Sequence, residues 1–460
     1  MSAINLDSLV SLCKRRGFIY QSSEIYGGLA AIYDYGPYGV ELANNIKQLW
    51  WKDLVYQYDN IVGLDSAIFM HPKVWQASGH IANFSDPLVE CRHCHSRLRA
   101  DELLAQIGVE ADETMPEDTI NKIFDDYRHL IFCPDCGQQD FTAVRRFNLL
   151  IQSNLGDFIG SRSEPVYLRG ETCQGIYVNY KNIMDSTRLQ LPFGIAQIGN
   201  AFRNEITARQ FIFRTREFEQ MELQYFIRPT EDFEEFNKWK ERRWNYYIHN
   251  LGINPDNLRW HEHEKLAFYA KAAFDIEYKF PFGFQEIEGI HARGDYDLKQ
   301  HQKFSDVKLD YYDPVADETF IPHIVEASSG VGRVFLMLLA EAYYEENLPD
   351  GSKRIVLRLK PAVAPIKIAV FPLLRNRPEL VVKAKTIFDQ LKLQWRCEFD
   401  DNGNIGKRYR RQDEIGTPYS ITVDFDTLDK NLVTVRDRDS MKQESINVDE
   451  LIAYLSSKLN

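Results

Sequence analysis

The sequence of 460 residues has no apolar run that approaches the roughly 20 residues of a membrane-spanning helix. Its opening stretch, MSAINLDSLVSLCKRRGFIY, contains no apolar core of the length found in a signal peptide. Low-complexity segments are also absent, so the composition gives no indication of disorder. We therefore expect a cytoplasmic protein of two or three domains that does not contact a membrane.

Cysteine is scarce. The chain has seven cysteines, an odd number, and four of them form two Cys-x-x-Cys pairs, Cys91/Cys94 and Cys133/Cys136. This set fits a reducing compartment and a metal site better than a disulfide framework. Because two such pairs can supply four thiolates, the sequence predicts a tetrahedral zinc site.

The spacing between the two pairs leaves alternatives open. It exceeds that of compact zinc ribbons, and it contains two expected helices at residues 101–107 and 117–127. His93 or His95 could replace a cysteine as a ligand, and four free thiols are the plainer interpretation. A redox pair is less favoured, because neither pair opens an evident helix after a strand.

Positive charge is also in short supply. The formal net charge is −12, which argues against a protein that coats nucleic acid along its length. From Lys360 onward, however, 17 Lys and Arg residues exceed 15 Asp and Glu residues, while the preceding residues hold 38 and 52. The C-terminal segment therefore has a net charge of +2 and the body −14, as expected of a protein that touches nucleic acid in limited places.

The phosphate-binding loops of common nucleotide folds are missing. The segment 321–340, IPHIVEASSGVGRVFLMLLA, reads as a strand, a glycine turn and a helix. It is not a dinucleotide fingerprint, because Phe335 stands where the third glycine would be, and no Gly-Lys-Ser/Thr sequence exists. Gly330 and Gly332 permit close backbone approach, and Arg333 lies in the first helical turn, where free N–H groups attract anions.

A second segment, 199–226, reads as two strands joined by a loop of about eight residues. Its second strand alternates with period 2. One face becomes apolar, with Met221, Leu223, Tyr225 and Ile227, and the other carries Arg214, Arg216, Phe218, Gln220, Glu222 and Gln224. On the partner strand, Arg203 and Glu205 also share a face. Such a surface can hold phosphates, a flat ring and an ammonium group, although a solvated, salt-bridged hairpin would show the same alternation.

These residues resemble a known family. Phe202-Arg203-Asn204-Glu205, a loop, Arg214 and then Phe218 resemble motif 2 of the class II aminoacyl-tRNA synthetases, and Gln220-Met221-Glu222 is similar to the form in dimeric glycyl-tRNA synthetases. The expected helix 40–55 and strand 61–70, with AIYDYGPYGVEL and VWQASGH around them, resemble motif 1. The segment 321–340 resembles motif 3, with Ala327 in place of the usual proline.

The resemblance covers essentially the whole chain and implies an α/β (α+β) fold: a class II antiparallel sheet flanked by helices, with a C-terminal α/β anticodon-binding domain and a small zinc-knuckle insertion. The implied division is 1–85 with motif 1, 86–145 as the insertion, 146–360 with motifs 2 and 3, and 361–460 as the anticodon-binding domain. The implied activity is the formation of glycyl-adenylate from glycine and ATP, then transfer of glycine to tRNA(Gly), by a homodimer that uses Mg²⁺.

Site residues follow from the matched motifs. The resemblance implies catalytic roles for Arg203 and Arg333. It implies ATP contacts by Arg203, Asn204, Glu205, Phe213, Arg214, Phe218, Glu286, Ile287, Gly330, Gly332 and Arg333. It implies glycine contacts by Arg99, Glu171, Phe218, Gln220, Glu222, Glu326 and Ser328. Glu171 is expected inside a strand-like run, 166–180, in which Gly170 replaces the usual proline and Cys173 the usual alanine. Arg99 could equally be a surface residue.

The C-terminal segment after Pro365 alternates between expected strands and helices. Its basic run, Lys407, Arg408, Arg410 and Arg411, can contact tRNA phosphates, and Tyr409 among them offers a stacking surface. A solvated helix face would give the same pattern.

Two other functions stay open at this point. A related synthetase of the same subclass would need a deeper amino-acid pocket. A non-enzymatic accessory protein on the same fold usually lacks the motif arginines, which this sequence keeps.

Overall fold

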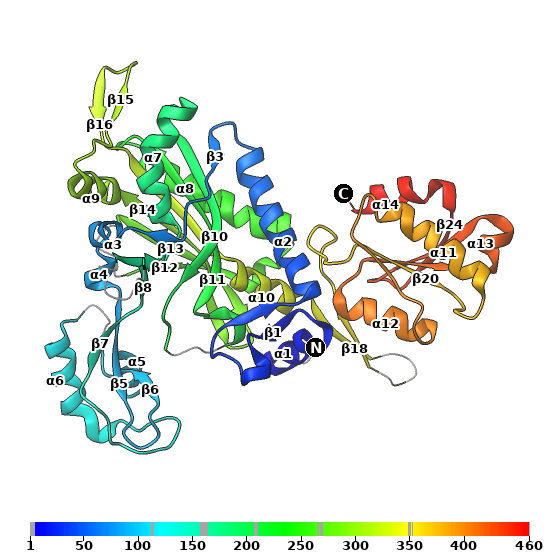
Figure 1. Ribbon diagram of the computed structural model, residues 1–460, viewed down its shortest axis with the longest axis horizontal. Helices are drawn as coiled ribbons and strands as arrows, with labels where there is room; N and C mark the ends of the chain where they lie inside the picture. Colours follow the sequence, from blue (N-terminus) through cyan, green and yellow to red (C-terminus); the bar gives the residue numbers. More distant parts are fainter. Residues whose placement is uncertain are drawn as a thin grey trace.

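The computed structural model describes residues 5–111, 115–156, 164–206, 210–264, 266, 270–347, 351 and 353–459. Figure 1 shows a central sheet with helices on both sides, a small lobe (cyan) and a separate C-terminal lobe (orange to red). In the described part of the chain, no helix is long and apolar enough to cross a membrane.

The central sheet has the order β12-β13-β14-β17-β11-β10-β3, and all its pairings are antiparallel except that of β10 with β3. Its strands are β3 (Ile61–Gly63), β10 (Phe193–Phe202), β11 (Glu217–Ile227), β12 (Leu258–Glu262), β13 (Ala272–Phe280), β14 (Gly283–Gly294) and β17 (His323–Gly330). The predicted alternation of β11 is confirmed, because the residues assigned to its apolar face, Met221, Leu223, Tyr225 and Ile227, all lie in the main core.

Helices α2 (Pro37–Trp51), α8 (Asp232–Asn245) and α10 (Val331–Ala342) contribute large side chains to that core, such as Trp50, Trp239 and Phe335. The opposite face of the sheet packs at one end against α7 (Cys173–Thr187) and α9 (Tyr296–Ser305), around Tyr180, Phe226 and Leu298. The polar side chains in the middle of that face are therefore left lining a cavity.

Three local predictions are wrong. Residues 166–180 are not one strand: β9 (Glu164–Leu168) ends before Glu171, and α7 follows, because Ile176, Tyr177, Tyr180 and Ile183 recur at helical spacing and face the sheet. Gly175 permits this packing, since a Cβ there would lie 2.0 Å from Ser66 Oγ.

The other two concern boundaries. The β10–β11 connection, 203–216, is longer than predicted and contains a 3₁₀ turn at Phe211–Phe213, and its residues 207–209 lie outside the described part of the chain. The expected strand 61–70 is two short strands, β3 and β4 (Phe69–Met70).

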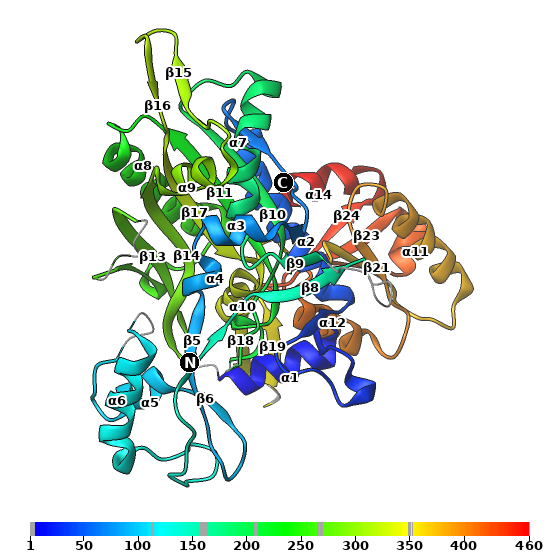
Figure 2. The ribbon, with the colours of Figure 1, turned by 60° about the vertical axis from the view of Figure 1, so that its left-hand side comes forward.

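The small lobe has a three-stranded sheet, β6-β5-β7, with its own apolar cluster. Its elements are β5 (Ser85–Glu90), β6 (Arg97–Arg99), α5 (Ala100–Gln106), α6 (Glu117–Tyr127) and β7 (Arg145–Asn148). Both helices predicted between the cysteine pairs are thus confirmed. Strands β8 (Ile151–Leu155) and β9, which are labelled beside each other in Figure 2, then lead back to the body in a sheet of order β4-β9-β8.

The C-terminal lobe is built on a five-stranded sheet of order β21-β20-β22-β23-β24. Its elements are β20 (Ile368–Pro372), α11 (Pro378–Leu391), β21 (Cys397–Phe399), α12 (Ile405–Ile415), β22 (Tyr419–Val423), α13 (Phe425–Lys430), β23 (Leu432–Asp437), β24 (Gln443–Asn447) and α14 (Leu451–Leu459). The predicted alternation of strands and helices is confirmed, although α13 and β24 were not predicted.

The remaining elements are α1 (Leu6–Arg16), β1 (Ile19–Gln21), β2 (Tyr33–Tyr35), α3 (Pro72–Ala77), α4 (His80–Asn83), β15 (Tyr311–Asp313), β16 (Glu318–Phe320), β18 (Tyr343–Asn347) and β19 (Lys353–Leu357). The body and the C-terminal lobe meet through apolar contacts, in which Ile415 of α12 joins the main core, and through polar contacts. Arg16 Nε lies 2.6 Å from Glu414 Oε2, and the Tyr38 hydroxyl donates to Glu398 at 2.9 Å.

Candidate active site

A cavity opens on the polar face of the central sheet, between β11, β14, β17 and the start of α10. It holds about 1050 Å³, counting the space at its mouth. Fourteen of the predicted ATP and glycine residues line it: Glu171, Arg203, Glu205, Phe213, Arg214, Phe218, Gln220, Glu222, Glu286, Glu326, Ser328, Gly330, Gly332 and Arg333. The fold therefore brings together residues from four separate stretches of the sequence.

Three carboxylates gather at the inner end of the cavity. Glu222 and Glu326 lie on the adjacent strands β11 and β17 and are 2% and 4% exposed, and Glu171 enters from the turn before α7. Acidic groups this close and this buried repel one another unless each finds a partner.

Glu326 has the most partners. It accepts hydrogen bonds from Arg293 Nη1 at 3.0 Å, Gln224 Nε2 at 2.8 Å and His291 Nδ1 at 2.9 Å. Burial alone would raise the pKa of Glu326, but Arg293 and His291 lower it to about 2. This carboxylate is thus a fixed negative charge.

Glu222 is held less completely. Ser328 Oγ donates to its Oε1 at 3.0 Å, whereas its buried Oε2 has no hydrogen-bond partner among the described residues. Burial, together with the negative charges of Glu326 and Glu171, raises the pKa of Glu222 to about 8. An unpaired carboxylate oxygen in this position is a place for a cationic ligand.

Glu171 is fixed from the side of α4 and α7. Its Oε1 lies 3.3 Å from His80 Nε2, and it accepts from Cys173 Sγ at 2.9 Å and from Gln174 Nε2 at 2.9 Å. Burial opposes ionisation, but His80 and Arg293 hold the pKa of Glu171 well below its usual value. Ser78 Oγ, 2.8 Å from His80 Nδ1, in turn orients the imidazole ring.

Arginines line the outer part of the cavity. The guanidinium of Arg203 lies between two rings, with its central carbon 5.2 Å from the centre of Phe84 and 5.3 Å from that of Phe218. Its Nε donates to Gly170 O at 3.0 Å, which leaves its terminal nitrogens near the cavity. Arg203 is thus held in place before any ligand binds.

Arg214 and Arg333 complete the cationic wall. Arg333 lies 2.8 Å from the Glu286 carboxylate and stacks over Phe213, 4.6 Å from the ring centre. Gly332, beside it, has room for hydrogen only, because a Cβ would lie 2.9 Å from Ile212 O. The start of α10 can therefore approach the connection that carries Arg214.

Several predicted residues lie elsewhere. Ile287 is fully buried in the main core, so its side chain does not reach the cavity. Arg99 is paired with Asp86 and Asp101 in a neighbouring hollow, which it shares with Arg203, Glu205 and Arg214. The side chain of Asn204 is not part of the cavity wall, while its backbone N–H donates to Leu149 O at 2.8 Å.

The sequence reasoning missed three functional candidates: His80, His291 and Arg293, of which the last two line the cavity. His80 lies in the VWQASGH segment, which was noted only for its resemblance to motif 1. Arg293 is 5% exposed although it is a charged residue of β14, and a buried charge requires a carboxylate partner. That requirement becomes visible only when Glu326 is placed beside it.

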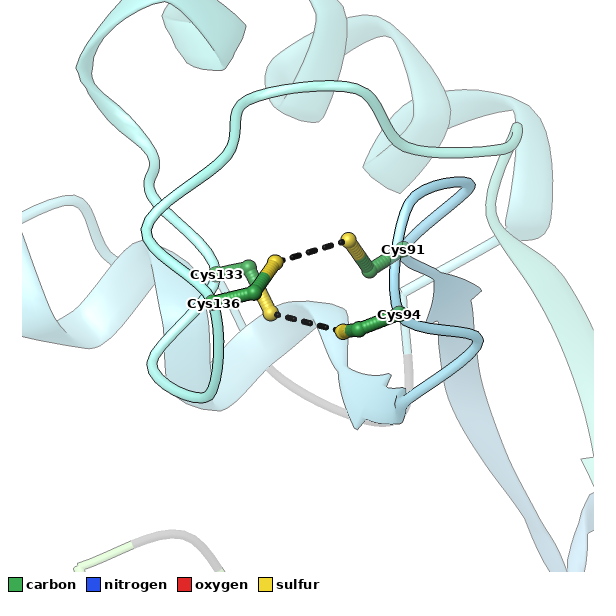
Figure 3. Close-up of side chains that lie close together, drawn as sticks. All are labelled: Cys91, Cys94, Cys133 and Cys136. Carbon is green, nitrogen blue, oxygen red and sulfur yellow. Dashed lines mark hydrogen bonds between the residues drawn. The ribbon is translucent and has the colours of Figure 1, made fainter.

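The four paired cysteines meet in the small lobe, as Figure 3 shows. Cys91 Sγ lies 3.6 Å from Cys136 Sγ, Cys94 Sγ lies 3.6 Å from Cys133 Sγ, and all four sulfurs are within 4.8 Å of one another. Zinc–sulfur bonds of about 2.3 Å at tetrahedral angles place sulfurs about 3.8 Å apart. The arrangement therefore fits one tetrahedral ion.

The basic run in the C-terminal lobe forms helix α12, but its members differ. Lys407 and Arg410 are exposed. Arg408 is 1% exposed and donates to the carbonyls of Pro372, Asp401 and Gly403, so its prediction as a tRNA contact is wrong.

Arg411 and Tyr409 are also engaged within the lobe. Arg411 Nε donates to Asp400 at 2.9 Å, and the Tyr409 hydroxyl lies 2.6 Å from Thr422 Oγ1. Arg436 covers the Tyr409 ring at 4.8 Å, so Tyr409 does not offer the free stacking surface that was expected.

Comparisons with known proteins agree with this geometry. Residues 158–342 match the family described as tRNA synthetase class II core domain (G, H, P, S and T), and residues 367–458 match the family described as Anticodon binding domain. The chain is 50% identical to a glycine–tRNA ligase of Borreliella burgdorferi, over 99% of this chain and 98% of that protein.

Two further relatives give the same result. The chain is 51% identical to a glycine–tRNA ligase of Clostridium acetobutylicum, over 99% of this chain and 98% of that protein. It is 48% identical to a glycine–tRNA ligase of Treponema denticola, over 99% and 97%. The predicted family and fold class are confirmed, and the chain belongs to the glycine–tRNA ligases, a family of class II aminoacyl-tRNA synthetases.

Proposed function

We propose that the cavity is where glycine and ATP react, with the amino group of glycine at the three carboxylates and ATP along the arginines. The single observation that carries this assignment is Glu222, whose buried Oε2 lacks a hydrogen-bond partner among the described residues and lies beside two ionised carboxylates. An ammonium group supplies both the missing hydrogen bond and the missing positive charge.

The first step needs positioning rather than a base. The glycine carboxylate attacks the α-phosphorus of ATP, the bond to the β-phosphate oxygen breaks, and pyrophosphate leaves. A carboxylate is already a nucleophile at neutral pH, so no proton has to be removed. In the second step, a hydroxyl of the 3′-terminal ribose of tRNA(Gly) takes the glycyl group, and AMP leaves.

Arg203 is the residue we assign to the reacting atoms, where it holds the α-phosphate and the glycine carboxylate. Its position between Phe84 and Phe218, with Nε already bonded, lowers the cost of ordering it. Phe218 offers the remaining surface of its ring to adenine. Arg214 and Arg333 are assigned to the β- and γ-phosphates.

Magnesium enters with ATP in this proposal. The carboxylate of Glu286 lies at the cavity wall and provides oxygen donors of the kind that Mg²⁺ prefers. When bound, the ion would neutralise developing charge on the phosphates.

Selectivity for glycine follows from its lack of a side chain. The ammonium and the carboxylate are its only binding groups, and Glu171, Glu222, Glu326 and Ser328 are assigned to the ammonium end. A larger side chain would collide with the packed walls around these residues, so rejection needs no second hydrolytic site.

We also propose a zinc ion at Cys91, Cys94, Cys133 and Cys136, since the sulfur spacing fits a tetrahedral site. Its role would be structural, because all four positions are taken by cysteines and the ion would join two turns of the small lobe.

The remaining assignments concern assembly and tRNA. We propose a cytoplasmic homodimer with the domain division 1–85, 86–145, 146–360 and 361–460, in which the last part contacts the anticodon. The exposed Lys407 and Arg410 of α12 support the tRNA contact, because phosphate contacts require accessible cations.

The decisive experiment is ATP–pyrophosphate exchange measured with each of the twenty amino acids in turn. We expect exchange with glycine at least two orders of magnitude above that with alanine, because a methyl group must enter a fully packed pocket. Equal exchange with alanine or serine would overturn the assignment of the three carboxylates as a glycine site.

A further inference from the structure

A second cluster of metal-ligating side chains lies on the central sheet beside the amino-acid pocket, and one of its members, His291, also lines the cavity. His263 follows β12, Asp275 is on β13 and His291 is on β14, so the three residues come from neighbouring strands of the central sheet, which Figure 1 shows. One ligand atom from each lies within 4.8 Å of the other two.

The hydrogen bonds of His263 and His291 show which of their ring nitrogens could coordinate a metal ion. His263 Nε2 lies 2.8 Å from Asp275 Oδ2. His291 uses Nδ1 to donate to Glu326, 2.9 Å away, which leaves the lone pair of its Nε2 directed away from that carboxylate. A ligating histidine usually has its other nitrogen bonded to a carboxylate in this manner, because the bond fixes the tautomer and the ring orientation.

The backbone leaves space for an ion between these atoms. A Cβ built on Gly289 would lie 3.1 Å from His291 Nε2 and 3.4 Å from Asp275 Oδ1. Glycine therefore keeps open the volume toward which the imidazole and the carboxylate converge. Two groups that both present lone pairs repel each other unless a proton or a cation lies between them.

We propose that His263, Asp275 and His291 bind a divalent transition-metal ion, of the class that includes Zn²⁺, Co²⁺ and Ni²⁺. Two imidazoles and one carboxylate favour these ions over Mg²⁺, which prefers an all-oxygen set. The site goes beyond glycine activation and does not depend on it. Because His291 also bonds to Glu326, an ion here would restrain one carboxylate of the amino-acid pocket.

The test uses the full-length protein with its cysteine site already filled with zinc. Co²⁺ is added, and absorption spectra and isothermal titration calorimetry follow its binding. We expect about one additional Co²⁺ per chain, with visible d–d bands and without the near-ultraviolet charge-transfer band of thiolate ligands. No uptake beyond the cysteine site, or uptake with a thiolate band, would overturn the proposal.

Variants separate this site from adventitious binding. His263→Ala and His291→Ala should each remove the additional Co²⁺, while His249→Ala, which changes an exposed histidine outside the cluster, should keep it. Glu326→Gln should weaken binding by about 10- to 100-fold, because it loses the carboxylate that orients His291.

Gly289→Ala is the sharpest variant, since it keeps all three ligands but fills the space between them. Loss of Co²⁺ in this variant, with an unchanged circular dichroism spectrum, would support the site even if a histidine variant fails to fold. Full Co²⁺ binding by folded His291→Ala protein, or full binding by Gly289→Ala, would overturn it and leave a shared proton as the explanation for the cluster.

Discussion

His80 Nε2 lies 3.3 Å from Glu171 Oε1, although α4, which carries His80, and the turn that carries Glu171 are far apart in the chain. Trp75 and Phe84 contact the imidazole edge to face, with ring centres 5.1 Å and 5.0 Å away, and Ser78 lies at its Nδ1. The ring is thus enclosed on several sides, and Glu171 is positioned by a residue that does not line the cavity.

We expect His80→Ala to raise KM for glycine by about 10- to 100-fold, because a hydrogen bond to a charged group contributes about 1.5–3 kcal/mol. KM for ATP should change little. His80→Gln keeps an N–H donor near Nε2 and should recover part of the loss. Steady-state exchange kinetics at varied glycine and varied ATP separate the two constants. Equal rises in both, in a folded variant, would show that His80 acts on the whole site and not on Glu171.

Glycine binding should release a proton from Glu222 at neutral pH. With a pKa raised to about 8 by burial, Glu326 and Glu171, this carboxyl is mostly protonated in the empty pocket at pH 7, and an ammonium ligand lowers that pKa. Glycine affinity should therefore rise as the pH increases from about 6 to about 8. Calorimetry in buffers of different ionisation enthalpy measures the release, and Glu222→Gln should abolish it.

The raised pKa of Glu222 also predicts how the free energy of unfolding changes with pH. The folded protein holds a proton on Glu222 up to about pH 8, whereas the unfolded chain loses it near 4.5. Stability from this group is therefore complete below about pH 4.5 and is lost as the pH rises toward 8. Glu222→Gln should flatten the decline in free energy of unfolding across that window. An unchanged pH profile in this variant would contradict the raised pKa.

Arg203→Ala should lower the rate of ATP–pyrophosphate exchange by about 100- to 1000-fold while the protein stays folded, because it removes a donor held against the transition state. Arg216→Ala is a matched control from the same connection. Its Nε donates to the backbone oxygen of Glu205 at 2.8 Å, and it is not part of the cavity wall, so the loss should be much smaller. Near-normal exchange by folded Arg203→Ala protein would remove Arg203 from the reaction.

Metal analysis of protein purified without added zinc should find about one zinc per chain. Cys133→Ser/Cys136→Ser should contain none, since two thiolates cannot complete a tetrahedral site. Cys397→Ala, which changes a buried thiol of the C-terminal lobe, should retain the metal. A metal-free native protein with reduced cysteines would leave four free thiols as the correct interpretation.

Substitution of the buried cation of α12 should lower stability, whereas substitution of its exposed cations should weaken aminoacylation. Arg408→Ala should reduce the free energy of unfolding by about 2–5 kcal/mol, since it removes the donors to three backbone carbonyls. Lys407→Ala/Arg410→Ala should cost much less stability than Arg408→Ala and should leave glycine activation unchanged, but it should weaken aminoacylation at low salt, with a difference that shrinks as salt rises. Chemical denaturation, exchange without tRNA and aminoacylation with it distinguish the two. Equal loss of exchange and aminoacylation in the double variant would place the tRNA contact elsewhere.

The sequence by itself determined those features of this protein that depend on regular spacing along the chain. The period of 2 in β11 assigned Met221 and Leu223 to the core and Phe218 and Glu222 to the cavity, since alternate residues of a strand must point to opposite faces. Cysteine spacing likewise indicated four converging thiols. Such features depend on neighbours in the chain, which the sequence displays directly.

Only the tertiary structure decided which distant groups pair. Glu171 was expected in a strand, but the apolar residues after it face the sheet as helix α7, and this leaves Glu171 in a turn beside His80. From the sequence, Arg408 was predicted to be a tRNA contact on the surface, but in the structure it is buried. The physical reason is common to both: burial and charge pairing depend on segments that are remote in sequence, and their energies outweigh the local preferences that a sequence pattern reports.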